Sequence, residues 1–221
     1  MSDTDDIEML ELASVPEALS LTAKLIRWGW GFIMARPEFV GCQQRMKDDK
    51  PGEAEWAISV RIVGGIPGLG LLESCTVKLI PEWYEKPEEY SSGPIRGFPN
   101  LDRSVGLRWQ KEPGSAEQEE QTLYKGRVYY IPIAIWKSAS GNKPSAAHFK
   151  TAKFFPTKEN ELQPGNYFFK IELKSGSKPP WRSNDYFQIG VPQNSENSMQ
   201  FNLSVVTQEQ FSERFGNRGS R

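Results

Sequence analysis

The sequence LQPGNYFFKIEL, residues 162–173, joins a tight turn directly to a strand. Pro164 fixes the φ angle that the turn needs, and Gly165 can adopt the positive φ that most residues avoid. Two sets of alternating side chains follow the turn: Tyr167, Phe169, Ile171 and Leu173 on one face, and Lys170, Glu172 and Lys174 on the other. This alternation predicts a strand that buries one face in a core and leaves the other in solvent.

The turn and the tyrosine that follows it resemble the tyrosine corner of immunoglobulin-like and fibronectin-like sandwiches. In that corner, a Tyr just after a turn hydrogen-bonds to upstream backbone. The resemblance covers only this turn and strand, and it implies a β-sandwich. Because the motif occurs in sandwiches with unrelated functions, it favours a fold and indicates no activity.

Other apolar or alternating stretches predict the remaining strands. They lie at residues 28–34, 56–63, 71–80, 105–109, 127–136, 185–191 and 199–206. In the third of these, Cys75, Val77 and Leu79 share the buried face. Pro132 places the strand at 127–136 at a sheet edge or at a bulge. We therefore predict a mainly β protein, an immunoglobulin-like or related antiparallel β-sandwich with an N-terminal helix.

Helices are predicted near both ends of the chain. Ser14 and Glu17 form a capping pattern that begins a helix over residues 15–27, and a short helix is predicted at residues 208–215. The predicted organisation has four parts: a flexible acidic N-terminus (1–13), an N-terminal helix plus short strand packed on the body (14–55), a β-sandwich domain (56–207), and a short helix or disordered tail (208–221).

Charge and composition favour a cytoplasmic protein. The net charge is −1, and the first 20 residues carry six acidic side chains but neither Lys nor Arg. Targeting segments have the opposite charge at this position. The uncharged stretch at 28–35 is far shorter than the roughly 20 residues needed to cross a bilayer, so no transmembrane segment is expected. In the cytoplasm, Cys42 and Cys75 are expected to remain separate reduced thiols.

The sequence offers little material for catalysis. His148 is the single histidine, and no serine lies in a GxSxG pattern. Two distant cysteines and one histidine do not make a zinc site. The glycine-rich stretch at 64–70 lacks the Lys-Ser/Thr pair of a phosphate-binding loop. We predict a protein that is not an enzyme and that uses no cofactor or metal.

One segment has a local basic bias. Residues 138–184 contain eight Lys or Arg and three Glu, with aromatic residues interleaved among the cations. Cations beside aromatic rings can hold a nucleotide or single-stranded nucleic acid, whereas the alternative is that the rings face the core and the lysines face solvent. Trp181 beside Arg182 is expected to be an exposed contact anchor. The candidate binding residues are Trp181, Arg182, Lys178, Lys150, Lys153 and Tyr129, the last on a strand expected at a sheet edge.

An acidic loop is a further feature to explain. Residues 112–120 carry four Glu and no basic residue, and the loop is expected to be solvated. It could shield the basic segment within the chain or engage a basic partner. Sequence patterns leave both alternatives open.

The leading functional interpretation is a non-catalytic cytoplasmic protein-interaction or scaffold subunit of a larger assembly. It follows from the absence of catalytic motifs and from the many aromatic residues and charged loops. The alternative is a sensing module that binds a nucleotide, another anionic small molecule or single-stranded nucleic acid through the basic and aromatic face.

Overall fold

The computed structural model describes most of the chain between residues 35 and 216. The described residues are 35–47, 50, 52–64, 71–87, 94–99, 101, 103–139, 145–152, 160–176, 179–193 and 201–216. Their elements are β1 (Arg36–Met46), β2 (Glu53–Val63), β3 (Leu71–Glu85), β4 (Ile95–Arg96), β5 (Val105–Leu107), β6 (Gln121–Tyr124), β7 (Val128–Lys137), β8 (Ala146–Phe149), β9 (Gly165–Ser175), β10 (Trp181–Arg182), β11 (Tyr186–Val191), β12 (Asn202–Val206) and α2 (Gln208–Phe215). This part of the protein is mainly β.

The helix in these ranges lies at the C-terminal end, where residues 208–215 were predicted to form one, and not at the N-terminal end. It begins with a capping box: the Gln210 N–H donates to Thr207 Oγ1 at 3.2 Å, and the Thr207 N–H donates to Gln210 Oε1 at 3.0 Å. The helix and strand expected at residues 15–27 and 28–34 lie outside the described residues. The fold class is therefore corrected to a mainly β protein with a short C-terminal helix.

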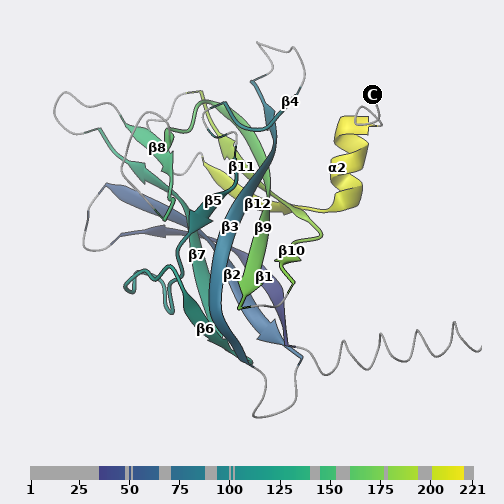
Figure 1. Ribbon diagram of the computed structural model, residues 1–221. Helices are drawn as coiled ribbons and strands as arrows, with labels where there is room; N and C mark the ends of the chain where they lie inside the picture. Colours follow the sequence, from purple (N-terminus) through teal and green to yellow (C-terminus); the bar gives the residue numbers. More distant parts are fainter. Residues whose placement is uncertain are drawn as a thin grey trace, which may run out of the picture.

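The strands form two antiparallel sheets (Figure 1). The smaller sheet has the order β1-β2-β7-β8, and the larger has the order β12-β11-β9-β3, with β4, β5 and β6 pairing along β3 and β10 pairing with β9. β1 pairs with β2 along nearly its whole length. Residues 36–46, within the range 14–55 where a helix and a short strand were predicted, are thus part of a sheet.

One hydrophobic core lies between the sheets and takes residues from both. Ile58 and Ile131 come from the smaller sheet, Leu79 and Ile171 come from the larger, and all four are fully buried. The edges of the sheets also approach each other: β1 lies near β12, and a bridge joins Gln110, just after β5, to Tyr130 in β7. The two sheets therefore cover the core on both faces. Contacts between the sheets also close it at two edges, where β1 nears β12 and where Gln110 bridges to Tyr130.

The predicted tyrosine corner is present. Tyr167 Oη accepts a hydrogen bond from the Gln163 N–H at 2.7 Å and donates to the Gln163 carbonyl at 3.0 Å. Gly165 has a φ of +141°, and a Cβ there would lie 2.5 Å from the Glu85 carbonyl oxygen and 2.6 Å from the Tyr84 ring. Tyr84 Oη in turn donates to the Pro164 carbonyl at 2.5 Å. The turn therefore requires glycine for both its conformation and its contacts.

The alternation predicted for β9 is confirmed, with one addition. Tyr167, Phe169, Ile171 and Leu173 are buried in the main core. Phe168, on the opposite face, is also fully buried, because it lies in a second cluster with Tyr186, Phe211 and Phe215. The last two belong to α2, which covers the outer face of the larger sheet at this point.

β7 corrects one expectation and confirms another. The strand lies between β2 and β8, so the region from Tyr129 to Trp136 is not the free sheet edge that we expected. The register shifts where Trp56 and Ala57 face Ala134 and Pro132, which confirms the bulge that Pro132 indicated. The proline is tolerated because the ladder is interrupted at the bulge, so no N–H has to be donated to the neighbouring strand at this position.

We predict that Gly165→Ala lowers the free energy of unfolding by about 2–4 kcal/mol, because Ala cannot adopt this φ cheaply and its Cβ would clash with Tyr84 and Glu85. Urea denaturation followed by tryptophan fluorescence measures the change. Gly41→Ala is the matched control, since a Cβ there has nothing within 4 Å. Equal effects of the two substitutions would contradict the role of the corner.

Candidate interaction surface

β10 presents two of the predicted binding residues. Trp181 pairs with Leu173 and Arg182 pairs with Glu172, both in β9. Arg182 Nε donates to Glu172 Oε2 at 2.7 Å while its side chain remains 61% exposed. Trp181, which was expected to be exposed, is instead half-buried, because its ring packs against the core. Of the predicted site residues, these two are brought together at the surface.

Trp181 belongs to an apolar group drawn from distant parts of the chain. Its ring centroid lies 5.2 Å from that of Phe39 in β1, and Phe39 lies 4.8 Å from Phe187. Val205 in β12 faces Phe187 across the strand pair and is 42% exposed, and Val40, next to Phe39, is 50% exposed. We call Phe39, Val40, Trp181 and Val205 the seam surface, because β1 and β12 approach each other there.

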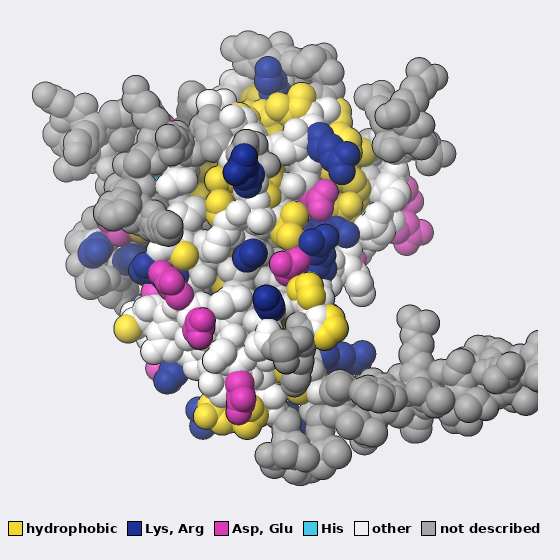
Figure 2. Space-filling model, in the orientation of Figure 1, with side chains coloured by type: hydrophobic (Ala, Val, Ile, Leu, Met, Phe, Trp, Pro, Cys, Tyr) yellow, Lys and Arg dark blue, Asp and Glu magenta, His cyan; other side chains and the backbone are white. Residues whose placement is uncertain are grey.

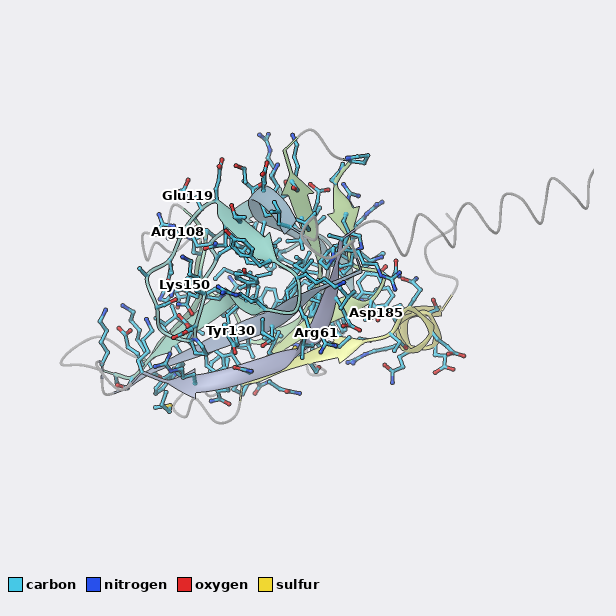
Figure 3. All side chains as sticks on the ribbon, turned by 90° about the horizontal axis from the view of Figure 1, so that it is seen from below. Arg61, Arg108, Glu119, Tyr130, Lys150 and Asp185 are labelled. Atoms are coloured by element: carbon cyan, nitrogen blue, oxygen red, sulfur yellow. The ribbon has the colours of Figure 1, made fainter. Side chains whose placement is uncertain are left out.

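Charged pairs lie beside the seam surface. Arg61 and Glu38, from the neighbouring strands β2 and β1, are 2.7 Å apart and about half exposed. Figure 3 places Arg61 close to the region where β1 and β12 meet. Arg182 and Glu172 form the second pair. Such exposed pairs contribute little to stability, so their side chains can exchange partners at low cost.

The other predicted site residues occupy different places. Tyr129 is 3% exposed, and its Oη accepts a hydrogen bond from the Tyr124 N–H at 2.9 Å. Lys150 is 7% exposed and ion-paired. Lys153 and Lys178 lie outside the described residues. Elsewhere in the basic segment, Lys170 Nζ lies 4.5 Å from the centroid of the Tyr186 ring. The cations of this segment therefore do not form a single patch in the described part of the chain.

The surface view supports this distribution. On the face drawn in Figure 2, basic and acidic side chains are interspersed, and no broad area carries only one sign. A mixed surface of this kind creates no strong field for a polyanion. The segment at 138–184 is basic in sequence, but its charge is spread over several elements.

Lys150 is held in a buried ionic network. Its Nζ lies 2.5 Å from Glu55 Oε2, and it also contacts the Glu117 carboxylate. Glu55 is 3% exposed. Burial alone lowers the pKa of Lys150, but the two carboxylates outweigh it, so its pKa is raised above the ordinary value. The ammonium group is therefore charged and neutralised within the protein.

This network adds a contact to the acidic loop. Most of residues 112–120 are exposed, as predicted, but Glu117 is partly buried and reaches Lys150, and Gly114 packs against Arg45 of β1. Glu119 lies 3.5 Å from Arg108. The loop thus covers the outer side of the smaller sheet. Of the two alternatives from the sequence, shielding of a basic residue within the chain occurs at Lys150.

The described reactive groups are not activated. Burial raises the pKa of the Cys42 thiol to about 11, which keeps it protonated and weakly nucleophilic at neutral pH. Burial also lowers the pKa of His148, an effect opposed by Glu161 and reinforced by Lys137. Cys42 and Cys75 are both free thiols. Within the described ranges, no cluster of His, Cys, Asp and Glu could hold a metal ion.

Three members of the seam surface were not identified from the sequence. Phe39 and Val40 lie in β1, which follows the strand predicted at residues 28–34 and was not itself predicted. Val205 lies in the strand predicted at residues 199–206, and it is exposed. The alternation in residues 199–206 indicates which face of the strand carries the Val205 side chain, but it does not indicate that this side chain is exposed.

Comparison with known proteins gives no family for this chain. No protein-family model, curated protein or solved structure matches it. Among the described elements, no helix has the length and apolar character needed to span a membrane. The functional argument therefore rests on the geometry of the chain itself.

We predict that Lys150→Met lowers the free energy of unfolding by about 3 kcal/mol, because the buried Glu55 would keep only its longer contact with Lys47, at 3.9 Å. Chemical denaturation measures the loss. The double variant Lys150→Met/Glu55→Leu should recover most of it, since both buried charges are then removed. Arg61→Met, which breaks an exposed pair, should cost no more than about 1 kcal/mol. Failure of the double variant to recover stability would contradict the network.

The network also predicts a loss of stability at alkaline pH. Because folding raises the pKa of Lys150 above 10.5, its contribution is complete below pH 10.5 and declines as pH rises through the higher folded pKa. Denaturation curves of the wild type and of Lys150→Met/Glu55→Leu between pH 8 and pH 12 measure this. We expect the wild type to lose more stability than the double variant. Parallel curves would refute the prediction.

Proposed function

We propose that this protein is a non-catalytic interaction module, a scaffold subunit that binds a partner protein through the seam surface. The observation that carries the proposal is the contact of Trp181 in β10 with Phe39 in β1, with exposed Val40 next to Phe39 in the chain and exposed Val205 opposite Phe187 in the strand pair. Solvent-exposed Val40 and Val205 contribute nothing to the closed core. Their exposure near the meeting of β1 and β12 supports a role in contact with another molecule.

The composition of the surface supports a protein partner. Interfaces combine an apolar centre with a polar rim, and Trp and Arg are frequent among the residues that dominate binding energy. Here the centre is apolar, and the Arg61–Glu38 and Arg182–Glu172 pairs lie beside it. The acidic partners keep the rim near neutrality, which favours a protein of mixed charge over nucleic acid.

The surface is also held in place before binding. The contacts of Trp181 with Phe39, and of Phe39 with Phe187, restrict the aromatic side chains. Side chains that are already ordered lose less conformational entropy when a partner binds. This preorganisation supports recognition by a folded surface.

We further propose that the two sheets form a sandwich of the immunoglobulin-like kind and that the protein acts in the cytoplasm. The Tyr167 corner and the core shared by the two sheets support the first proposal. The two free thiols support the second. In this interpretation the sheets are a rigid support for the seam surface.

We predict that Val40→Asp and Val205→Asp, each alone, weaken capture of the partner protein by about tenfold or more, because a charge would be buried at the centre of the interface. Quantitative mass spectrometry of proteins that co-purify with the tagged full chain measures this. Both residues are exposed, so the fold should tolerate the changes.

Ile95→Asp is the control, since Ile95 is also exposed but lies in β4, away from the seam surface. It should leave capture unchanged. A partner retained equally by all three variants would remove the seam surface as the binding site. Turnover of a substrate by the purified chain would contradict the non-catalytic role.

A further inference from the structure

A pocket lies between the acidic loop, β6 and the start of β7. Its volume is about 480 Å³, within the range of roughly 300–1,000 Å³ typical of small-molecule sites. Its lining includes Lys111 just before the acidic loop, Glu112 at the start of the loop, Gln121 and Tyr124 from β6, Arg127 just before β7, and Tyr130 in β7. The residues of the seam surface take no part in it.

The mouth of the pocket combines cations with an aromatic ring. Lys111 and Arg127 are exposed, and the Arg127 guanidinium carbon lies 5.4 Å from the centroid of the Tyr124 ring. Tyr124 is 48% exposed. Arginine binds phosphate and carboxylate groups through two parallel hydrogen bonds, and an exposed tyrosine ring can stack on a planar ligand. These groups suit a planar molecule that carries an anion.

Glu112 limits how much negative charge the pocket can accept. It is the acidic residue in the lining, against two basic ones. One anionic group is well matched by this balance, whereas a triphosphate or a nucleic acid strand would bring further negative charge towards Glu112. Strong binding of nucleic acid requires several phosphate contacts. The charge balance therefore favours a single phosphate.

Gln121 contributes a hydrogen-bond acceptor to the site. Its side-chain Nε2 donates to the Thr122 carbonyl at 2.9 Å. Because that carbonyl can only accept, the amide orientation is fixed and Oε1 is the atom left over. Gln121 is 7% exposed, and Oε1 has no hydrogen-bond partner. A buried acceptor without a donor is unusual. Oε1 has almost no exposed surface, so a ligand N–H satisfies it once the Gln121 side chain turns towards the pocket that it lines.

The wall of the pocket formed by the loop is ordered by its own contacts. The Ser115 N–H donates to the Glu112 carbonyl at 3.0 Å, and the Gly114 N–H donates to Gln110 Oε1 at 3.2 Å. Further along, Glu117 is tied to Lys150. Lys111 and Glu112 are thus presented by a folded segment, so the pocket needs little rearrangement to receive a ligand.

We propose that this pocket binds a mononucleotide whose base carries an amino group. The phosphate lies between Lys111 and Arg127, the base packs against Tyr124 and Tyr130, and the amino group donates to Gln121 Oε1. The pocket and the seam surface are separate, so nucleotide binding is a second function beside the proposed protein interaction. It does not depend on the partner protein.

The test is isothermal titration of the purified full chain with CMP, UMP, cytidine and inorganic phosphate. CMP and UMP have the same size and phosphate, but CMP has an amino donor where UMP has a carbonyl acceptor. CMP should bind saturably, and UMP and cytidine should each bind about tenfold or more weakly, because one loses the Gln121 contact and the other the phosphate. Inorganic phosphate should bind more weakly than CMP.

Variants connect the binding to the named residues. Arg127→Ala and Tyr124→Ala should each weaken CMP binding by about tenfold, and both residues are exposed, so the fold should be retained. Gln121→Leu should reduce the preference for CMP over UMP. Arg96→Ala, which removes an exposed cation on β4, is the control and should bind like the wild type.

Several results would overturn the proposal. Absence of saturable CMP binding would remove the site, and equal binding of inorganic phosphate would reduce it to a general anion site. Equal binding of CMP and UMP would refute the role of Gln121. Loss of the partner protein in the Val205→Asp variant would leave the nucleotide result unaffected, so the two proposals succeed or fail separately.

Discussion

The close approach of the turn at Pro164 and Gly165 to Tyr84 is the constraint on which the larger sheet depends. A Cβ at position 165 has no room, and the hydroxyls of Tyr84 and Tyr167 donate to the carbonyls of Pro164 and Gln163. β9 is thereby placed in register on β3. β3 carries β4, β5 and β6 on its other side, so their positions follow from the same contact.

The corner is also insensitive to pH in the physiological range. Burial raises the pKa of Tyr84, and burial raises the pKa of Tyr167, with a further contribution from the neighbouring Tyr84. Both hydroxyls therefore remain protonated and can donate their hydrogen bonds. A structural element held by neutral donors is well suited to anchor the sheets, whereas the charged Lys150 network responds to alkaline pH.

Sequence patterns predicted the elements whose burial is set locally. The alternation in β9, the shared face of Cys75, Val77 and Leu79, and the helix α2 are all present. These elements bury one face of a simple repeating pattern. The sequence could also identify the turn, since proline and glycine restrict or extend φ regardless of their surroundings.

Contacts between distant segments could not be predicted in the same way. Lys150 has the sequence context of a surface lysine, but its partner Glu55 lies 95 residues away. Phe168 alternates to the polar side of β9, yet α2 covers it. β1 begins next to a proline, and it is held in the sheet by its pairing with β2 and not by a regular alternation of its own. Of the predicted site residues, Trp181 and Arg182 could be recognised because a short turn leads directly to them.

The two candidate sites share a structural cause. Both lie where the edges of the two sheets approach each other: the seam surface where β1 nears β12, and the pocket beside the bridge between Gln110 and Tyr130. At such junctions the strands diverge. Side chains from distant segments meet there, but they pack less completely than in the core and leave space between them. Because the approaching edges cover each other, addition of a partner strand is disfavoured there. Recognition at both junctions therefore depends on side chains, which is why a single substitution at the surface can test each site without disturbing the sheets.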